Sequence, residues 1–80
     1  MQNVRSLIET AIVSSSMIKK MEYERLNQSL TVYFVSGNVY RYLAVPGTLF
    51  DELLNADSIG SLFYNKIRQH PEEYSCTRIA

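Results

Sequence analysis

The feature that most constrains the fold is a pair of short alternating segments, residues 30–35 and 39–43, on either side of Ser36-Gly37-Asn38. Both segments are rich in β-branched and aromatic residues, which favour extended strands, and the residues between them are typical of turns. The pattern therefore predicts a β-hairpin. A third alternating segment, residues 17–23, precedes a polar turn and extends the hairpin into an antiparallel meander.

The hairpin loop decides which side chains share a face of the sheet. We expect a three-residue loop at residues 36–38, with Asn38 in the left-handed backbone conformation that asparagine tolerates. This register pairs Phe34 with Tyr40 and Val32 with Tyr42. One predicted face then carries Leu30, Val32, Phe34, Tyr40 and Tyr42, and the other carries Thr31, Tyr33, Val35, Val39, Arg41 and Leu43.

Two helices are predicted after the meander. Pro46 suits the first position of a helix over residues 46–54, whose apolar residues fall on one face. A second helix is predicted from Asp57 or Ser58 to about residue 69, and Pro71 ends it. The tail, residues 74–79, has strand composition and can add an edge strand. These elements predict an α+β fold, in which a small antiparallel β-meander of three to four strands carries two helices on one face.

The N-terminal segment has the apolar spacing of an amphipathic helix, with Asn3 available as its cap and apolar residues at Val4, Leu7, Ile8, Ala11 and Ile12. A helix is therefore predicted over residues 3–13, although its end is β-branched. A chain of 80 residues is long enough for one domain. We expect residues 1–13 to be an extension, either a helix or a dimerisation arm, and residues 14–80 to form a single domain.

Composition excludes several classes of protein. Eight basic and eight acidic residues give a net charge of zero, which excludes a strong chain-wide attraction to nucleic acid or to an anionic membrane. A single cysteine, Cys76, cannot form an internal disulfide, and with the single His70 it does not make a zinc site. No apolar stretch reaches the roughly 18 residues of a membrane span, and the first residues lack the features of a signal peptide. We expect a cytoplasmic protein.

No arrangement of residues predicts catalysis. Ser14, Ser15 and Ser16 lack the glycine elbow of a nucleophilic serine, and the only histidine stands far from them, next to a proline. Cys76 and His70 lie near the end of the sequence, where a plain thiol is the simpler interpretation. The three glycines do not form a phosphate-binding loop. The sequence therefore predicts a protein that is not an enzyme and that needs no cofactor or metal.

The second predicted face of the hairpin is unusually apolar for a surface exposed to solvent. Arg41 is expected to lie across the strands from Tyr33, within reach of a cation–π contact. Around this pair the face carries Val35, Val39 and Leu43. We expect this face to be covered by the N-terminal apolar stripe, by a second copy of the chain, or by a ligand.

The basic residues allow two interpretations. Lys19, Lys20, Lys66 and Arg68 can be separate solvated charges, or they can converge with Arg41 on one rim. Such a rim, interleaved with aromatic residues, would suit single-stranded RNA.

The order of motifs resembles the KTSC domain family. The resemblance runs from about residue 13 to residue 74 and rests on Ser14-Ser15-Ser16-Met17-Ile18, Tyr23, Leu30-x-Val32-x-Phe34-x-Ser36-Gly37, Val39-Tyr40-Arg41-Tyr42, Val45-Pro46 and Ala56-x-Ser58-x-Gly60-x-x-Phe63-x-Asn65-x-Ile67. The central Tyr40-Arg41-Tyr42 corresponds to the family's Tyr-x-Tyr motif. Where family members often carry basic residues on either side of a glycine, this chain has Ile59 and Ser61.

The resemblance implies an accessory domain without known catalytic activity, for which RNA binding is suggested by its occurrence at the C-terminus of lysyl-tRNA synthetases. Two hypotheses of function follow. The first is weak binding of RNA or tRNA through Tyr33, Arg41, Lys66 and Arg68. The second is association with a protein partner, or with a second copy as a homodimer, through Tyr33, Val35, Val39 and Leu43.

Overall fold

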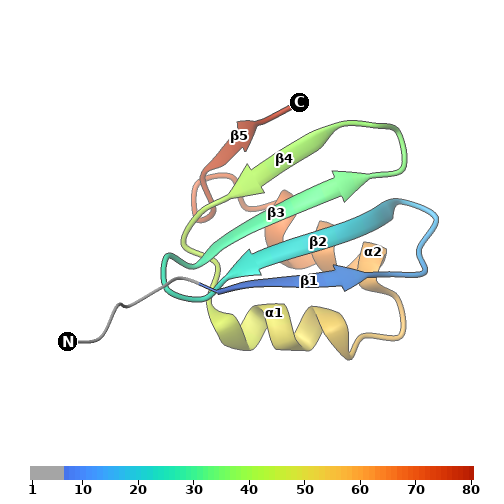
Figure 1. Ribbon diagram of the computed structural model, residues 1–80, viewed down its shortest axis with the longest axis horizontal. Helices are drawn as coiled ribbons and strands as arrows, with labels where there is room; N and C mark the ends of the chain where they lie inside the picture. The colour runs from blue at the N-terminus through green and yellow to red at the C-terminus, as the bar shows by residue number, and fades with distance from the viewer. Residues whose placement is uncertain (1–6) are drawn as a thin grey trace.

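The computed structural model describes residues 7–80, which form a five-stranded antiparallel sheet with helices on one face (Figure 1). The strands are neighbours in sequence order throughout. They are β1 (Ile8–Ile12), β2 (Ile18–Glu24), β3 (Ser29–Phe34), β4 (Val39–Tyr42) and β5 (Cys76–Arg78). The helical layer consists of α1 (Gly47–Leu54), α2 (Ile59–Phe63) and a π-helical segment, η1 (Tyr64–Arg68), that continues α2. The predicted α+β class is confirmed, with five strands instead of three to four.

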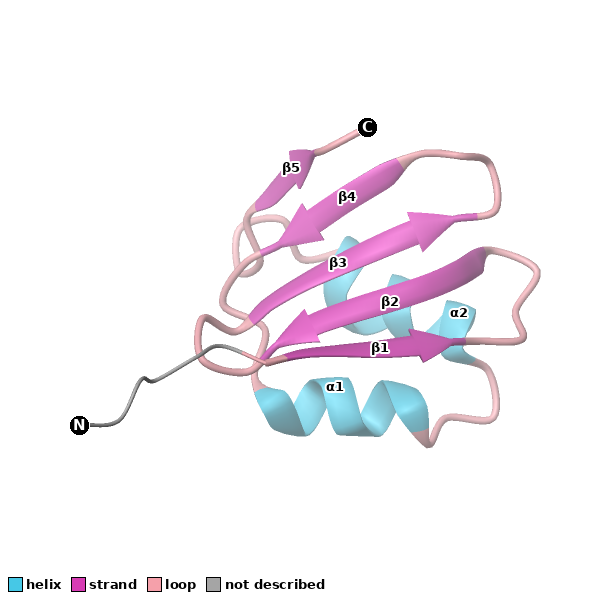
Figure 2. Ribbon diagram, viewed as in Figure 1, coloured by secondary structure: helices cyan, strands magenta, loops and turns pink. Residues whose placement is uncertain are grey.

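The core lies between the sheet and the helices, which stand behind the sheet in Figure 2. Alternation in the strands places every second side chain in this layer. The largest side chains that are fully buried there are Tyr23, Phe50, Phe63, Ile18, Met21, Leu30, Leu53, Ile67, Val32 and Val45. The predicted inward face of the hairpin is confirmed, because Leu30, Val32, Phe34 and Tyr42 are buried and Tyr40 packs against them. The opposite side of the sheet, which no helix covers, is called the open face below.

The hairpin register differs from the predicted one by two residues, which leaves the faces unchanged. Val32 lies opposite Tyr40, and Tyr33 lies opposite Val39. The loop has three residues, as predicted, but they are residues 35–37, and the amide of Phe34 donates to the carbonyl of Asn38 across it at 2.9 Å. Gly37, with φ of 102°, takes the left-handed position expected for Asn38. Glycine adopts this conformation at no steric cost, whereas asparagine only tolerates it.

Replacing Gly37 with alanine is expected to destabilise the fold by about 1 kcal/mol, because an L-residue strains at this positive φ. The new methyl group would meet no atom within 4 Å, so the change isolates the cost of the backbone conformation. Urea unfolding followed by circular dichroism measures it. Gly37→Asn is the matched control and is expected to lose less stability, since asparagine enters the left-handed region more easily. Equal stability of Gly37→Ala and the wild type would contradict this explanation of the loop.

The described part of the N-terminal segment is a strand and not the predicted helix. Residues Ile8–Ile12 form β1, which pairs with β2 so that Ile8 lies opposite Glu24 and Ile12 opposite Lys20. Ile8, Thr10 and Ile12 are β-branched and alternate, which suits a strand once the edge of β2 is available as a partner. The proposed cap Asn3 and the apolar Val4 lie outside the described residues. The predicted edge strand in the tail is confirmed as β5.

The predicted helices are present. Pro46 directly precedes α1, and the Ser58 side chain caps α2 by accepting a hydrogen bond from the amide of Ser61 at 3.3 Å. Phe50 of α1 stacks on Tyr23 of β2, with ring centroids 4.5 Å apart. The hydroxyl of Tyr23 donates to the carbonyl of Val45, so the same tyrosine also holds the segment that leads into α1.

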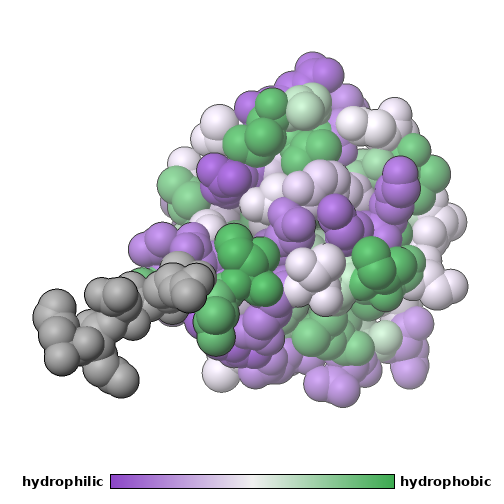
Figure 3. Space-filling model, in the orientation of Figure 1, coloured by the Kyte–Doolittle hydropathy of each residue, from purple (hydrophilic) through white to green (hydrophobic). Residues whose placement is uncertain are grey.

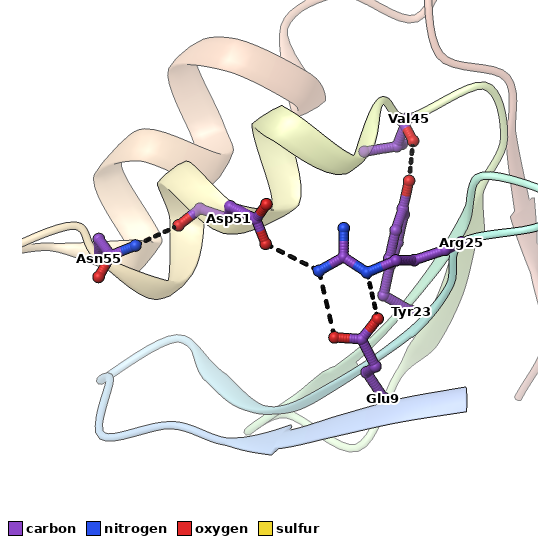
Figure 4. Close-up of polar contacts among 6 residues, drawn as sticks. All are labelled: Glu9, Tyr23, Arg25, Val45, Asp51 and Asn55. Atoms are coloured by element: carbon purple, nitrogen blue, oxygen red, sulfur yellow. Dashed lines mark hydrogen bonds and ion pairs between the residues drawn. The ribbon is translucent and has the colours of Figure 1, made fainter. Parts of the chain in front are cut away.

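An arginine clamp ties α1 to the edge of the sheet (Figure 4). Arg25, just after β2, donates through Nε and Nη2 to the carboxylate of Glu9 on β1, and its Nη2 lies 2.8 Å from Asp51 on α1. The guanidinium also stands 5.6 Å from the Tyr23 ring centroid. Its charge is satisfied by two carboxylates, so this cluster positions elements and offers no free cation to a ligand.

Candidate ligand groove

A groove of about 670 Å³ opens on the helix side of the sheet, between the end of the β3–β4 hairpin and η1. Its size falls within the range of about 300–1,000 Å³ that is typical of ligand sites. We call it the tyrosine groove and define it by six of its lining residues, Phe34, Tyr40, Tyr42, Arg68, Tyr74 and Cys76. It draws on three segments that are distant in the sequence: the hairpin, η1 and the C-terminal strand.

The sheet supplies the aromatic wall of the tyrosine groove. Tyr40 and Tyr42 point to the same side because they are two residues apart on β4. Tyr42 is only 5% exposed and packs edge-on against Phe63 of α2, with ring centroids 5.3 Å apart. Tyr40 is half-buried and stands edge-on to Phe34, with centroids 5.9 Å apart and planes at 84°. Tyr42 is therefore part of the core, whereas Tyr40 is only partly covered and lines the groove.

Among residues 7–80, Arg68 is the only charged side chain that lines the tyrosine groove. Its guanidinium carbon lies 5.9 Å from the centroid of the Phe34 ring, and within residues 7–80 it has no carboxylate partner. A guanidinium held beside an aromatic ring keeps its N–H groups available for a phosphate or carboxylate. Since none of the described lining residues is acidic, the tyrosine groove holds no negative charge that would repel an anion.

The hydroxyl of Tyr42 stays protonated in this setting. Burial, and then the hydrogen bond with Cys76 on the paired strand β5, raise the pKa of Tyr42. A tyrosine with a raised pKa is neutral at physiological pH and acts as a hydrogen-bond donor or acceptor. Cys76 itself is an exposed free thiol at the mouth of the tyrosine groove.

The raised pKa of Tyr42 predicts a loss of stability at alkaline pH. In the unfolded chain this tyrosine ionises near pH 10, whereas the folded protein resists its ionisation. The contribution of the protonated Tyr42 to the free energy of unfolding is therefore complete below about pH 10 and is lost as the pH rises above that value. We expect the free energy of unfolding to fall above pH 10, and to fall less steeply in Tyr42→Phe, as measured by urea unfolding between pH 8 and 11. Identical slopes in both proteins would show that other groups, such as the buried Tyr23, dominate.

The four residues predicted to contact RNA are divided between the two sides of the sheet. Tyr33 and Arg41 are on the open face, as their alternation with the buried Val32 and Tyr42 requires. Lys66 and Arg68 are exposed on η1, in the helical layer behind the sheet. The structure therefore does not bring the four together on one rim, and of these only Arg68 reaches the tyrosine groove.

The predicted cation–π pair on the open face has a different cation. Arg41 lies opposite Thr31 and donates through Nε to its hydroxyl at 3.3 Å. The cation over the Tyr33 ring is Lys20, whose Nζ is 4.2 Å from the centroid. Tyr33 in turn donates to Glu22 at 2.8 Å. The two-residue shift in register moved Arg41 away from Tyr33, so the predicted contact was wrong.

The residues predicted as an apolar interaction face do not form one continuous patch. Val35 is in the hairpin loop and lines the tyrosine groove, whereas Tyr33 and Val39 are half-buried neighbours on the open face. Leu43, 42% exposed, borders a separate hollow of about 390 Å³. The paired strands align five polar side chains across the middle of the open face: Thr10, Glu22, Thr31, Arg41 and Thr77. Figure 3 shows that the hydrophobic areas on this face are separate from one another.

Three comparisons place the chain among known proteins. The KTSC domain family matches residues 14–70. The chain belongs to this family. A crystal structure of a KTSC domain protein from Yersinia pestis superposes with a TM-score of 0.82 at 28% identity, covering 92% of this chain and all of that one. A protein of Stutzerimonas stutzeri is 39% identical over 67 residues, which cover 84% of this chain and 92% of that protein.

Larger proteins also contain a similar segment. The lysine–tRNA ligase of Trichormus variabilis is 47% identical over 53 residues, and that of Nostoc punctiforme is 43% identical over 53 residues. These matches cover 66% of this chain but only 9% of each ligase. In this KTSC domain, β1 and β5 lie outside residues 14–70, the range that the family matches. Tyr74 and Cys76, which line the tyrosine groove, also lie outside that range.

Within residues 7–80 no helix is long and apolar enough to cross a lipid bilayer, and no three His, Cys, Asp or Glu side chains are grouped so that they could hold a metal ion. Among the residues that define the groove, sequence reasoning had not assigned Phe34, Tyr74 or Cys76 to a site. The alternation of β3 and β4 placed Phe34 on the same face as the two tyrosines. No local sequence pattern indicated that the C-terminal chain brings Tyr74 and Cys76 to the tyrosine groove.

Proposed function

We propose that this KTSC domain is a non-catalytic RNA-binding module and that the RNA contacts the tyrosine groove. The observation that carries the proposal is that Arg68 and Tyr40 line the same concave site. Arg68 is a cation without a carboxylate partner in the described chain, Tyr40 is half-buried, and no described acidic side chain lines the site. Aromatic rings stack on bases and arginine binds phosphate, so the pair offers both contacts that RNA requires.

The similarity to a segment of lysine–tRNA ligases supports RNA as the partner. The zero net charge of the chain implies modest affinity, because few phosphates are neutralised and few counterions released. The open face is the less favourable site. There Arg41 shares its hollow with Glu22 and Glu24, whose carboxylates oppose a phosphate backbone.

Two arginine variants distinguish the faces. Arg68→Ala removes the cation of the tyrosine groove, and Arg41→Ala removes the exposed arginine in the middle of the open face as a matched control. We expect Arg68→Ala to weaken binding of fluorescently labelled tRNA about tenfold, the loss of a hydrogen bond to a charged group, and Arg41→Ala to leave it nearly unchanged. Fluorescence anisotropy at about 50 and 200 mM salt gives both the affinity and its salt dependence.

Each possible result of this titration has a definite meaning. A larger loss in Arg41→Ala than in Arg68→Ala would move the RNA site to the open face. If the wild type shows no salt-dependent binding to tRNA, the domain does not act through RNA. Circular dichroism of both variants confirms that any loss arises in a folded protein.

Association through the open face is the second candidate function. The observation that favours it is a pair of exposed aliphatic side chains, Ile8 and Leu43, that border the same hollow from opposite ends of the meander. A second copy or a protein partner that filled this hollow would bury both. Sedimentation equilibrium tests the self-association: a dimer that persists at high salt supports it, and a monomer at 100 μM excludes it.

A further inference from the structure

The shape of the tyrosine groove limits the kind of ligand that it can hold. Its volume of about 670 Å³ is concave space between the hairpin and η1, and is not a flat surface. A regular RNA duplex keeps its bases stacked and paired and presents a convex backbone, so it cannot place a base in such a space. An unpaired nucleotide can turn its base outward and insert it.

Arg68 and Asn38 supply N–H donors at the groove, whose serine and tyrosine hydroxyls can donate or accept. Arg68 has no ion pair within residues 7–80. Asn38 accepts from Arg78 through its Oδ1 at 3.1 Å, which leaves its amide group as a donor toward the groove it lines. The hydroxyls of Ser16 and Ser36 are also at the groove. Donors without acidic competitors match a ligand rich in acceptors, such as a phosphate joined to a base with ring carbonyls.

The rings and the cation are arranged for the two ends of one nucleotide. Tyr40 is half-buried at the groove, while Tyr42 and Phe34 are buried beside it. Arg68 is next to Phe34 and close enough to Tyr42 that its positive charge opposes the rise in the pKa of Tyr42. A base against Tyr40 would therefore leave its phosphate near Arg68 within a single site.

We infer that the tyrosine groove binds one unpaired nucleotide, with the base stacked on Tyr40 and the phosphate held by Arg68, so that the domain selects single-stranded over duplex RNA. This inference rests on the RNA-binding function proposed above and specifies the form of RNA that the site accepts. Neither the family nor the relatives' names assign such a site.

The test compares one RNA in two forms. A fluorescein-labelled 16-nucleotide RNA of mixed sequence that does not fold on itself is titrated alone and after annealing to its complementary strand, with the wild type, Tyr40→Ala and Tyr40→Phe. We expect the single strand to bind at least tenfold more tightly than the duplex. Tyr40→Ala should weaken single-strand binding fivefold or more, the effect of losing one base–aromatic stack, while Tyr40→Phe keeps the ring and the affinity.

A second measurement does not depend on any variant. Uridine monophosphate added to the ¹⁵N-labelled wild type is expected to shift the amide signals of Asn38, Tyr40, Tyr42 and Arg68, and not those of Thr31 or Arg41 on the open face. If duplex binds as tightly as single strand and still requires Arg68, the RNA function stands and the unpaired-nucleotide inference is overturned. If neither RNA form binds, both fall. Shifts caused by an oligoglutamate peptide but not by the nucleotide would assign the groove to an acidic protein segment instead.

Discussion

Replacing Phe63 with alanine is expected to destabilise this KTSC domain by about 3–5 kcal/mol, the range seen when a buried phenylalanine is truncated. Phe63 is fully buried, and its ring centroid lies 5.7 Å from that of Phe34 and 5.3 Å from that of Tyr42. A domain of this length has a total stability of about 4–12 kcal/mol, so the change removes a large fraction of it. Urea unfolding measures the loss.

The same substitution should also disturb the tyrosine groove. Without Phe63 behind them, Phe34 and Tyr42 can relax toward the helical layer, and the wall that holds Tyr40 moves with them. Phe63→Leu keeps most of the volume and is expected to cost less than about 1.5 kcal/mol. A loss below 1 kcal/mol for Phe63→Ala would show that α2 does not pack on the sheet as described.

Replacing Phe50 with alanine is expected to cost a similar 3–5 kcal/mol but to act on a different part of the molecule. Phe50 is fully buried and stacks on Tyr23, and this contact holds α1 against the sheet. We expect the amides of α1 to exchange with deuterium faster in the variant while those of β3 and β4 change only with global stability. The exposed ion pairs of Arg25 with Glu9 and Asp51 are too solvated to replace the lost packing.

Together, the two variants separate an effect on global stability from an effect on the tyrosine groove. Phe63 contacts residues of the tyrosine groove, whereas Phe50 contacts Tyr23 at the other end of the core. At conditions where both variants are folded, nucleotide binding should be weaker in Phe63→Ala and unchanged in Phe50→Ala. Equal losses in both would indicate that binding responds to global stability and not to the wall behind the groove.

The parts of the fold that depend on local pattern could be predicted from the sequence. Alternation with a period of two assigned the inward and outward residues of β3 and β4, because that period is a property of the strand itself. The register could not be fixed in the same way. Gly37 and Asn38 both accept a left-handed conformation, and moving the loop by one position shifts the pairing by two residues without changing the faces.

The N-terminal strand shows where local pattern fails. Leu7, Ile8, Ala11 and Ile12 fit a helical stripe, but Ile8, Thr10 and Ile12 also alternate as a strand does. The choice between them is made by the free edge of β2, which no local window contains. When a short segment fits both periodicities, its tertiary partners decide whether it forms a helix or a strand.

The candidate site follows the same division. The sequence placed Tyr40 and Tyr42 on one face, and both line the tyrosine groove. Arg68 lines it too, and its role as an RNA contact stays a prediction. Alternation also predicted that Arg41 faces away from these tyrosines, but no local pattern could predict that Arg68 would lie on their side of the sheet. That outcome depends on how η1 crosses the sheet and on the return of the chain to β5, which are long-range features of the fold.

The walls of the tyrosine groove are not equally free to change. Phe34 and Tyr42 belong to the hydrophobic core as well as to the groove, so substitutions there alter folding before they alter recognition. Asn38 and Arg68 also line the groove but are not part of the core cluster. Family members that come to prefer different ligands should therefore diverge first at these two positions, while the aromatic floor beneath them is retained by the demands of folding alone.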